Sequence, residues 1–180
     1  DKVRAEGPSY LVLLHDEIAR VTGDRRDIAN RFALLFRAVA AQEIDANGRQ
    51  PFSGDETYRT AMPIAHGYAI DEQFTVGFSS LDSSVLLAVA AERLADHATE
   101  LGLATQAQAL GDLAAQARSA AETYYRASDG GYLPYVDPNS GLATRLFEDA
   151  SFKPAWTGFL DGDLARGRAS VRALWDALAN

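Results

Sequence analysis

The sequence of 180 residues contains no cysteine, which excludes disulfide bonds, thiolate chemistry and zinc held by sulfur. The absence of cysteine also leaves the redox compartment, and with it the localisation, unassigned. Long apolar runs are missing as well, since no stretch approaches the roughly 20 residues that a membrane-spanning helix needs. We therefore expect no membrane partner.

Positive charge is scarce and scattered. The chain has 17 Lys and Arg against 25 Asp and Glu, a net charge of −8, and no run of basic residues. Because binding to a phosphate backbone depends on clustered positive charge, nucleic acid is excluded as a partner. The three histidines, His15, His66 and His97, do not have metal-ligand spacing. Carboxylates can bind Ca²⁺, but a spaced calcium-loop pattern is missing, so we predict neither a metal nor a cofactor.

The remaining composition is that of an ordinary folded protein. Hydrophobic residues make up 47% of the chain and charged residues 23%, which is typical of one globular domain with a core. The chain begins with "DKVRAEGPSY", which has neither an initiator Met nor the apolar core of a signal peptide. We predict a single domain over residues 1–180 that is a fragment of a larger protein.

Apolar residues recur with helical spacing in five segments, and turn residues separate them. The expected helices run from Ser9 to Thr22, from Asp24 to near Asn47-Gly48, from Ser80 to Leu101, from Thr105 to near Ser128, and from Gly162 onward. Tyr124 and Trp175 fall at helical positions that are typical of a core. No run shows convincing alternation of apolar and polar residues, so a substantial sheet is not expected. The fold class is predicted to be all-α.

The connections between these helices are unequal. Short links after Thr22 and after Leu101 predict two antiparallel helical hairpins. The loops over about residues 49–79 and 130–160 are much longer than the usual 2–8 residues, and both are expected at one end of the hairpins. Helix starts near positions 9, 80 and 162 are too far apart for a solenoid of helix pairs. This spacing favours a toroid of helical hairpins.

Both long loops combine carboxylates with aromatic residues. The first contains "FSGDETYR", with Asp55 and Glu56, and the second contains "YLPYVDP" and "FEDASFKPAWTGF". Sugar rings pack on aromatic side chains, their hydroxyls bind carboxylates and arginine, and paired acids cleave the glycosidic bond. The two loops therefore predict a carbohydrate site.

The motifs "PFSGDETY", "FSSLDSSVLLAVAAERLADHA" and "YLPYVDP…FEDASFKPAWTGF" resemble a middle portion of bacterial six-hairpin (α/α)6 toroid glycoside hydrolases. A more distant likeness is to the glucoamylase and maltose phosphorylase clan. The resemblance implies that Glu56, just before an inner helix, is the general acid of an inverting hydrolase. It also implies that the general base comes from a late helical loop, supplied by the remainder of the same polypeptide or by another chain that completes the toroid.

The same resemblance implies that Asp55 or Arg59 binds sugar hydroxyls, and the other residues of the two long loops add further candidates. The candidate substrate-binding residues are Asp55, Tyr58, Arg59, His66, Glu148, Asp149 and Trp156. Trp156 is the candidate for stacking on a sugar ring.

Structural alternatives stay open for these residues. "SGDET" is also typical of a turn followed by a helix start, and the pair Glu148-Asp149 is typical of solvated or capping positions. Trp156 can equally plug its loop against the helices. The alternative function is a non-catalytic helical module that binds sugar or a protein partner through the same loops.

Overall fold

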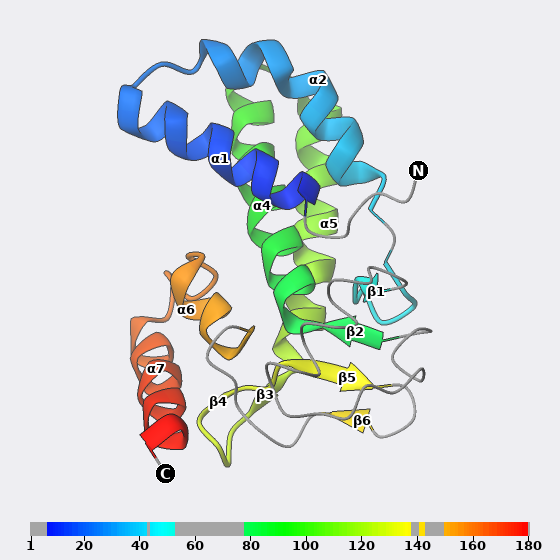
Figure 1. Cartoon of the computed structure of the whole chain (residues 1–180). Coiled ribbons are helices and arrows are strands. Elements are labelled where there is room, and N and C mark those ends of the chain that lie inside the picture. The colour runs from blue at the N-terminus through cyan, green and yellow to red at the C-terminus, as the bar shows by residue number, and fades with distance from the viewer. Residues whose placement is uncertain (1–6, 43, 53–77, 138–140, 143–149, 180) are drawn as a thin grey trace.

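A computed structural model of the chain describes residues 7–42, 44–52, 78–137, 141–142 and 150–179 (Figure 1). This part is mostly helical, which confirms the all-α class. Its helices are α1 (Gly7–Thr22), α2 (Arg26–Ala40), α4 (Leu81–Glu100), α5 (Ala104–Glu122), the single-turn α6 (Lys153–Trp156) and α7 (Leu164–Ala179). A short 3-10 helix, η2 (Ala150–Phe152), leads into α6.

Local signals set most of the helix ends. Gly23 and Gly102 follow α1 and α4 with φ values of +70° and +72°, which only glycine adopts without strain, so both predicted stops are confirmed. At the start of α7, the carboxylate of Asp163 accepts a hydrogen bond from the Arg166 backbone N–H at 3.0 Å. This contact satisfies one of the donors that a helix start leaves free.

Two predicted helix ends are wrong, and both helices stop earlier. After α2, the Asp45 carboxylate accepts the backbone N–H groups of Asn47 and Arg49 at 2.8 and 2.9 Å, which builds a turn that competes with further helix. After α5, strand β3 (Tyr125–Arg126) pairs with β4 (Gly131–Tyr132) before the chain reaches the predicted end. Thr105 does not cap α5, since that helix already begins at Ala104.

Helix α4 is the centre of the core. Every residue from Leu81 to Ala91 is buried, so this half of the helix is enclosed on all sides. Helix α5 packs along the length of α4, while α1 and α2 cross the far half of this pair and α6 lies beside the other half, towards the start of α4 (Figure 1). A helix enclosed all round is expected at the centre of a helical array rather than on its surface.

A small antiparallel sheet lies at the start of α4 (Figure 1). Its strands are β1 (Pro51–Phe52), β2 (Phe78–Ser80), β5 (Tyr135–Asp137) and β6 (Gly141–Leu142), in the order β1-β2-β5-β6. Each strand has only two or three residues, in agreement with the expectation that no substantial sheet forms. The backbone N–H of Leu81 donates to the carbonyl of Pro134 at 2.9 Å and ties α4 to this sheet.

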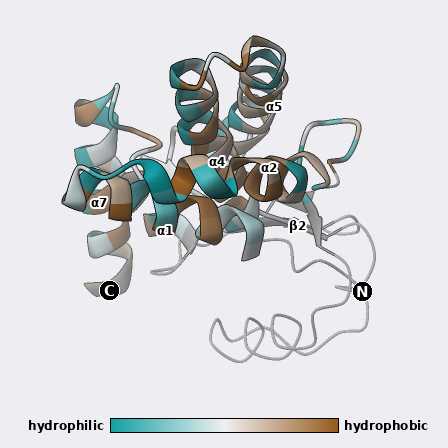
Figure 2. Cartoon of the chain, turned by 90° about the horizontal axis from the view of Figure 1, so that it is seen from above, coloured by the Kyte–Doolittle hydropathy of each residue, from teal (hydrophilic) through white to brown (hydrophobic). Residues whose placement is uncertain are grey.

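The outer surfaces of α1 and α7 carry apolar side chains. On α1, Leu14 is 56% exposed and Val21 is 68% exposed, and brown segments recur along this helix in Figure 2. On α7, Leu174 is buried, but Trp175 is 73% exposed, so the predicted core position of Trp175 is wrong. The helix covers the rest of the molecule with one side only, and Trp175 lies on the other side. Tyr124, by contrast, is fully buried as predicted.

Candidate functional site

Most of the predicted carbohydrate-binding residues lie outside the described residues. These are Asp55, Glu56, Tyr58, Arg59, His66, Glu148 and Asp149. The structure does describe the two ends of the segment that carries Glu56. Pro51 pairs with Ser79 and Phe52 pairs with Phe78, so this segment leaves from β1 and returns on β2, directly before α4.

The same sheet joins the two long loops. Ser79 of β2 pairs with Val136 of β5, and Ser80 pairs with Tyr135. Hydrogen bonds between these backbones hold the chain before α4 against the chain after α5. The described ends of the segment that carries Glu56, in β1 and β2, and strand β5 of "YLPYVDP" therefore lie in one sheet at the start of α4.

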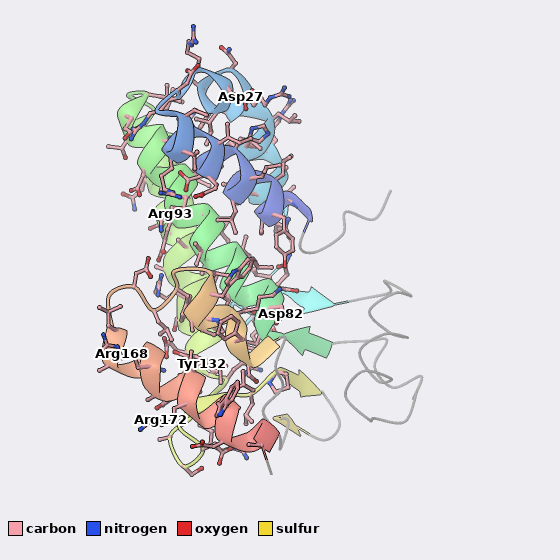
Figure 3. The ribbon with its side chains drawn as sticks, turned by 60° about the vertical axis from the view of Figure 1, so that its left-hand side comes forward. Asp27, Asp82, Arg93, Tyr132, Arg168 and Arg172 are labelled. Carbon is pink, nitrogen blue, oxygen red and sulfur yellow. The ribbon has the colours of Figure 1, made fainter. Side chains whose placement is uncertain are left out.

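Polar side chains occupy the buried start of α4. Asp82 is only 3% exposed, and Ser83 and Ser84 are fully buried. Figure 3 shows Asp82 next to the strands. A carboxylate is favourable in the first helical turn because the backbone N–H groups there carry partial positive charge. Sequence reasoning missed Asp82, although its signal is visible as "DSS" inside an otherwise apolar helical pattern.

A charged pocket of about 440 Å³ opens where the second half of α4, the last turns of α5 and the segment between α6 and α7 come together. Its charged lining residues are Glu92, Arg93, Asp96, Arg118, Glu122, Asp161, Asp163 and Arg166. Figure 3 shows Arg93 on this side of α4. Five carboxylates and three guanidinium groups in so small a space suit a polar ligand better than an apolar one.

Arg118 fixes one wall of this pocket. Its Nε and Nη2 atoms donate to the two carboxylate oxygens of Glu92 at 2.6 and 2.7 Å, and its Nη1 donates to the carbonyl of Phe159 at 2.7 Å. The guanidinium also lies 4.2 Å from the centre of the Phe159 ring. The paired, stacked geometry holds α4, α5 and the segment before α7 together.

Arg166 fixes the opposite wall. It donates to the Glu122 carboxylate, and it lies 4.0 Å from the Tyr125 ring centre and 5.0 Å from that of Tyr132. The Tyr132 hydroxyl donates to the same carboxylate at 3.1 Å. Burial, followed by the charge of Glu122, raises the pKa of Tyr132 above its ordinary value, so this phenol stays protonated.

These contacts limit the chemistry of the charged pocket. Glu92 and Glu122 already accept charge-assisted hydrogen bonds from Arg118 and Arg166, so both carboxylates are engaged within the protein. Arg93 is held more loosely, 3.9 Å from Asp161 and 4.0 Å from Asp16. The pocket is therefore suited to binding a polar ligand, with Arg93 as the guanidinium that has only long ion pairs within the described residues. No local sequence signal predicts it, because its ion pairs join residues far apart in the chain.

Trp156 is the one predicted site residue within the described part of the chain. It ends α6 and is 59% exposed, so the alternative that it plugs its loop against the helices is wrong. The Lys153 ammonium lies 5.4 Å from the Trp156 ring centre and donates to the Tyr10 hydroxyl at 2.8 Å. An exposed aromatic face beside a cation and a phenol provides a surface on which a sugar ring can stack.

Comparison of the chain with protein-family models, with curated proteins and with solved structures finds no significant match. Within the described ranges, no three metal-ligating side chains come together in a group that could hold an ion. None of the helices described is both long and apolar enough to cross a membrane. The geometry above and the likeness of the loop motifs are therefore the basis for assigning a function.

Proposed function

We propose that the chain is part of an (α/α)6 toroid glycoside hydrolase that cleaves glycosidic bonds with inversion, with Glu56 as the general acid. The observation that carries the proposal is the pairing of β1 with β2. This pairing anchors both ends of the Glu56 segment immediately before α4, the place where the resembling hydrolases present their acid before an inner helix.

The burial of the helices supports the same arrangement. In a toroid of hairpins, inner helices are covered on all sides near the site, while outer helices keep one face in water. α4 is buried at every residue from Leu81 to Ala91, whereas α5 alternates buried with exposed positions. In the proposed toroid, α4 is an inner helix and α5 is its outer partner.

The proposed reaction divides the work between two carboxyl groups. Glu56 donates a proton to the glycosidic oxygen, and a second carboxylate about 6.5–9.5 Å away activates water on the opposite face of the sugar. Asp55, Tyr58 and Arg59 bind hydroxyls, with further contacts from His66, Glu148 and Asp149. Trp156 stacks on a neighbouring ring. The remainder of the polypeptide, or another chain that completes the toroid, supplies the second carboxylate.

A second candidate is a non-catalytic helical module that binds sugar or a protein partner. The exposed ring of Trp156, flanked by Lys153 and Tyr10, favours it. Such a surface can bind without any acid near the ligand. The two candidates differ in one measurable respect, since only the hydrolase turns its ligand over.

The substitution Glu56→Gln tests the proposal. Turnover of a panel of oligosaccharides is expected to fall about 10²–10⁴-fold, the usual contribution of a general acid, because the amide cannot donate the proton. NMR of the first product should show the inverted anomer. Glu17→Gln is the control, since Glu17 is exposed on α1 and pairs only with Arg20 among described residues. If the panel is bound but never hydrolysed by the parent protein, the non-catalytic module replaces the hydrolase.

A further inference from the structure

One side of α7 presents an apolar stripe to water. Leu164, Val171 and Trp175 follow each other at helical spacing and are 65%, 40% and 73% exposed. They share this side with Arg168, and the stretch from Leu164 to Trp175 covers about 16 Å of helix. Soluble monomers seldom leave such large apolar side chains in a row without a binding role.

The stripe forms one wall of a groove of about 780 Å³, here called the α7 groove. Ala155 from α6 and Leu160 from the following segment form the facing wall. One wall is α7, and the other combines Ala155 of α6 with Leu160 of the turn that follows, so the groove offers apolar side chains rather than the edge of a sheet. This geometry fits an added helix and does not fit an added β-strand.

The two arginines and the two carboxylates that line the α7 groove differ in their contacts. Arg168 and Arg172 extend outward from α7 (Figure 3), and within the described part of the chain neither guanidinium has a hydrogen-bond or ion-pair partner. The two carboxylates that line the groove are engaged, since Asp161 lies 3.9 Å from Arg93 and Asp176 also has an interaction partner. The groove therefore presents two guanidinium groups that have no partner within the described residues, on a chain whose net charge is −8.

We propose that the α7 groove binds an amphipathic helix of a partner protein, with apolar residues facing Leu164, Val171 and Trp175 and with Asp or Glu facing Arg168 and Arg172. Helices that dock in a groove use apolar anchors at a spacing of three, four and seven residues, which is the spacing on α7. Trp175 is the expected centre of binding, because Trp and Arg are the residue types that most often dominate an interface.

Other occupants fit the same observations less well. A second copy that pairs α7 with α7 around a two-fold axis places the positive charges of both copies at one interface, which is unfavourable. A sugar gains little from the aliphatic side chains of Leu164 and Val171. The proposal is argued separately from the hydrolase, because none of the described residues that line the α7 groove is assigned to catalysis.

Two synthetic helical peptides test the proposal on the whole chain. Both have about 16 residues, which covers this stretch of α7 with half a turn to spare at each end, and both carry Leu at the anchor spacing. One has Glu beside the Leu stripe and the other has Lys. Binding is measured by calorimetry and by the fluorescence of Trp175. The Glu peptide is expected to bind at least about tenfold more tightly than the Lys peptide, with the difference shrinking at high salt.

Variants locate the binding surface. Trp175→Ala and the double change Arg168→Glu with Arg172→Glu should each weaken the Glu peptide at least about tenfold. All three side chains are exposed, so circular dichroism should show an unchanged fold. Leu34→Ala and Arg37→Glu, at exposed positions on α2, are the matched controls and should bind like the parent protein.

Each other outcome overturns the proposal. Equal affinity for the two peptides would contradict the binding of acidic side chains by Arg168 and Arg172. Loss of binding in the α2 controls would show that the peptide does not bind at α7. If neither peptide binds, the groove is not a site for a helix.

Binding of the chain to anionic phospholipid vesicles in place of the peptides indicates a membrane surface. A dimer that Trp175→Ala dissociates indicates that a second copy covers the groove. Glu56→Gln should leave peptide binding unchanged, which separates this result from that of the hydrolase test.

Discussion

At the scale of single residues, the charged pocket depends on two arginines that use the whole guanidinium group. Arg118 binds two carboxylate oxygens and one carbonyl while its face lies over an aromatic ring. Arg166 lies over two tyrosine rings and binds Glu122. Lysine offers neither the planar face nor the fork of donors, so arginine is required at both positions. The result is a rigid pair of walls between which Arg93 stays available.

Tyr132 makes this network sensitive to high pH. Burial, followed by the nearby Glu122 charge, raises the pKa of its phenol above the ordinary value of 10.0. The unfolded chain therefore loses this proton at a lower pH than the folded chain does. Above pH 10 the folded state binds the extra proton, so the free energy of unfolding falls as pH rises, by at most about 1.4 kcal/mol per pH unit from this group.

Tyr132→Phe tests this prediction, because phenylalanine keeps the ring and removes the ionisable hydroxyl. Urea unfolding at about pH 8 and about pH 11 should show a smaller loss of stability in the variant than in the parent protein. Tyr10→Phe serves as the control, since Tyr10 is 37% exposed and its hydroxyl accepts a hydrogen bond from Lys153 rather than contacting Glu122. An identical alkaline loss in Tyr132→Phe and the parent would show that this phenol does not carry the effect.

At the scale of secondary-structure elements, the turn after α2 is pressed against α5. Gly48 has a φ of +75°, and a Cβ atom added there would lie 2.9 Å from Cγ of Gln116 and 3.0 Å from its backbone carbonyl oxygen. Side chains do not normally approach backbone so closely. Gly102, after α4, has a similar φ of +72° but open space around it. Substitution of Gly102 therefore measures the cost of backbone strain alone, whereas substitution of Gly48 adds the cost of crowding against α5.

Alanine at both positions should reveal the difference. Gly102→Ala is expected to lower the free energy of unfolding by about 1–2 kcal/mol, the cost of a left-handed backbone for a residue with a side chain. Gly48→Ala should cost more, because the turn must also move away from α5. Urea titration measures both. Equal losses would mean that the turn after α2 shifts freely and does not brace α5.

Local signals predicted the elements whose ends depend on neighbouring residues. The stops at Gly23 and Gly102 and the start of α7 after Gly162 follow from such signals. The ends of α2 and α5 could not be predicted from such signals, because Asp45 builds a turn after α2 and β3 pairs with β4 after α5. Helical spacing marked Trp175 as core because a pattern shows which side of a helix is apolar, not whether another element covers it.

The same limit applies to the candidate sites. Composition and the loop motifs predicted a carbohydrate site, and Trp156 proved to be exposed, as a stacking residue must be. The charged pocket was not predicted, since its ion pairs join α4 to α5, and α5 to α7, across long stretches of sequence. Contacts of this kind depend on how the helices pack. A single sequence contains no local pattern that specifies them.

At the scale of the whole molecule, the fluorescence of the two tryptophans shows whether the surfaces of α6 and α7 are covered in solution. The chain has only two tryptophans, Trp156 on α6 and Trp175 on α7, and the structure exposes 59% and 73% of them. An indole in water emits at longer wavelength and is quenched more readily than one in a core. If no second copy covers these rings, the emission of the chain should change little on unfolding in urea, and acrylamide should quench both tryptophans in the native state.

Single-tryptophan variants assign that signal. Trp156→Phe leaves only Trp175, and Trp175→Phe leaves only Trp156; neither change should lower the free energy of unfolding by more than about 0.5 kcal/mol, because both rings are exposed. In Trp156→Phe, the acidic peptide should protect the remaining Trp175 from quenching by acrylamide. In Trp175→Phe, the peptide should leave the quenching of Trp156 unchanged, because Trp156 does not line the α7 groove. A blue-shifted native emission, or quenching that weakens as protein concentration rises, would contradict an exposed surface and show that copies of the chain cover it themselves.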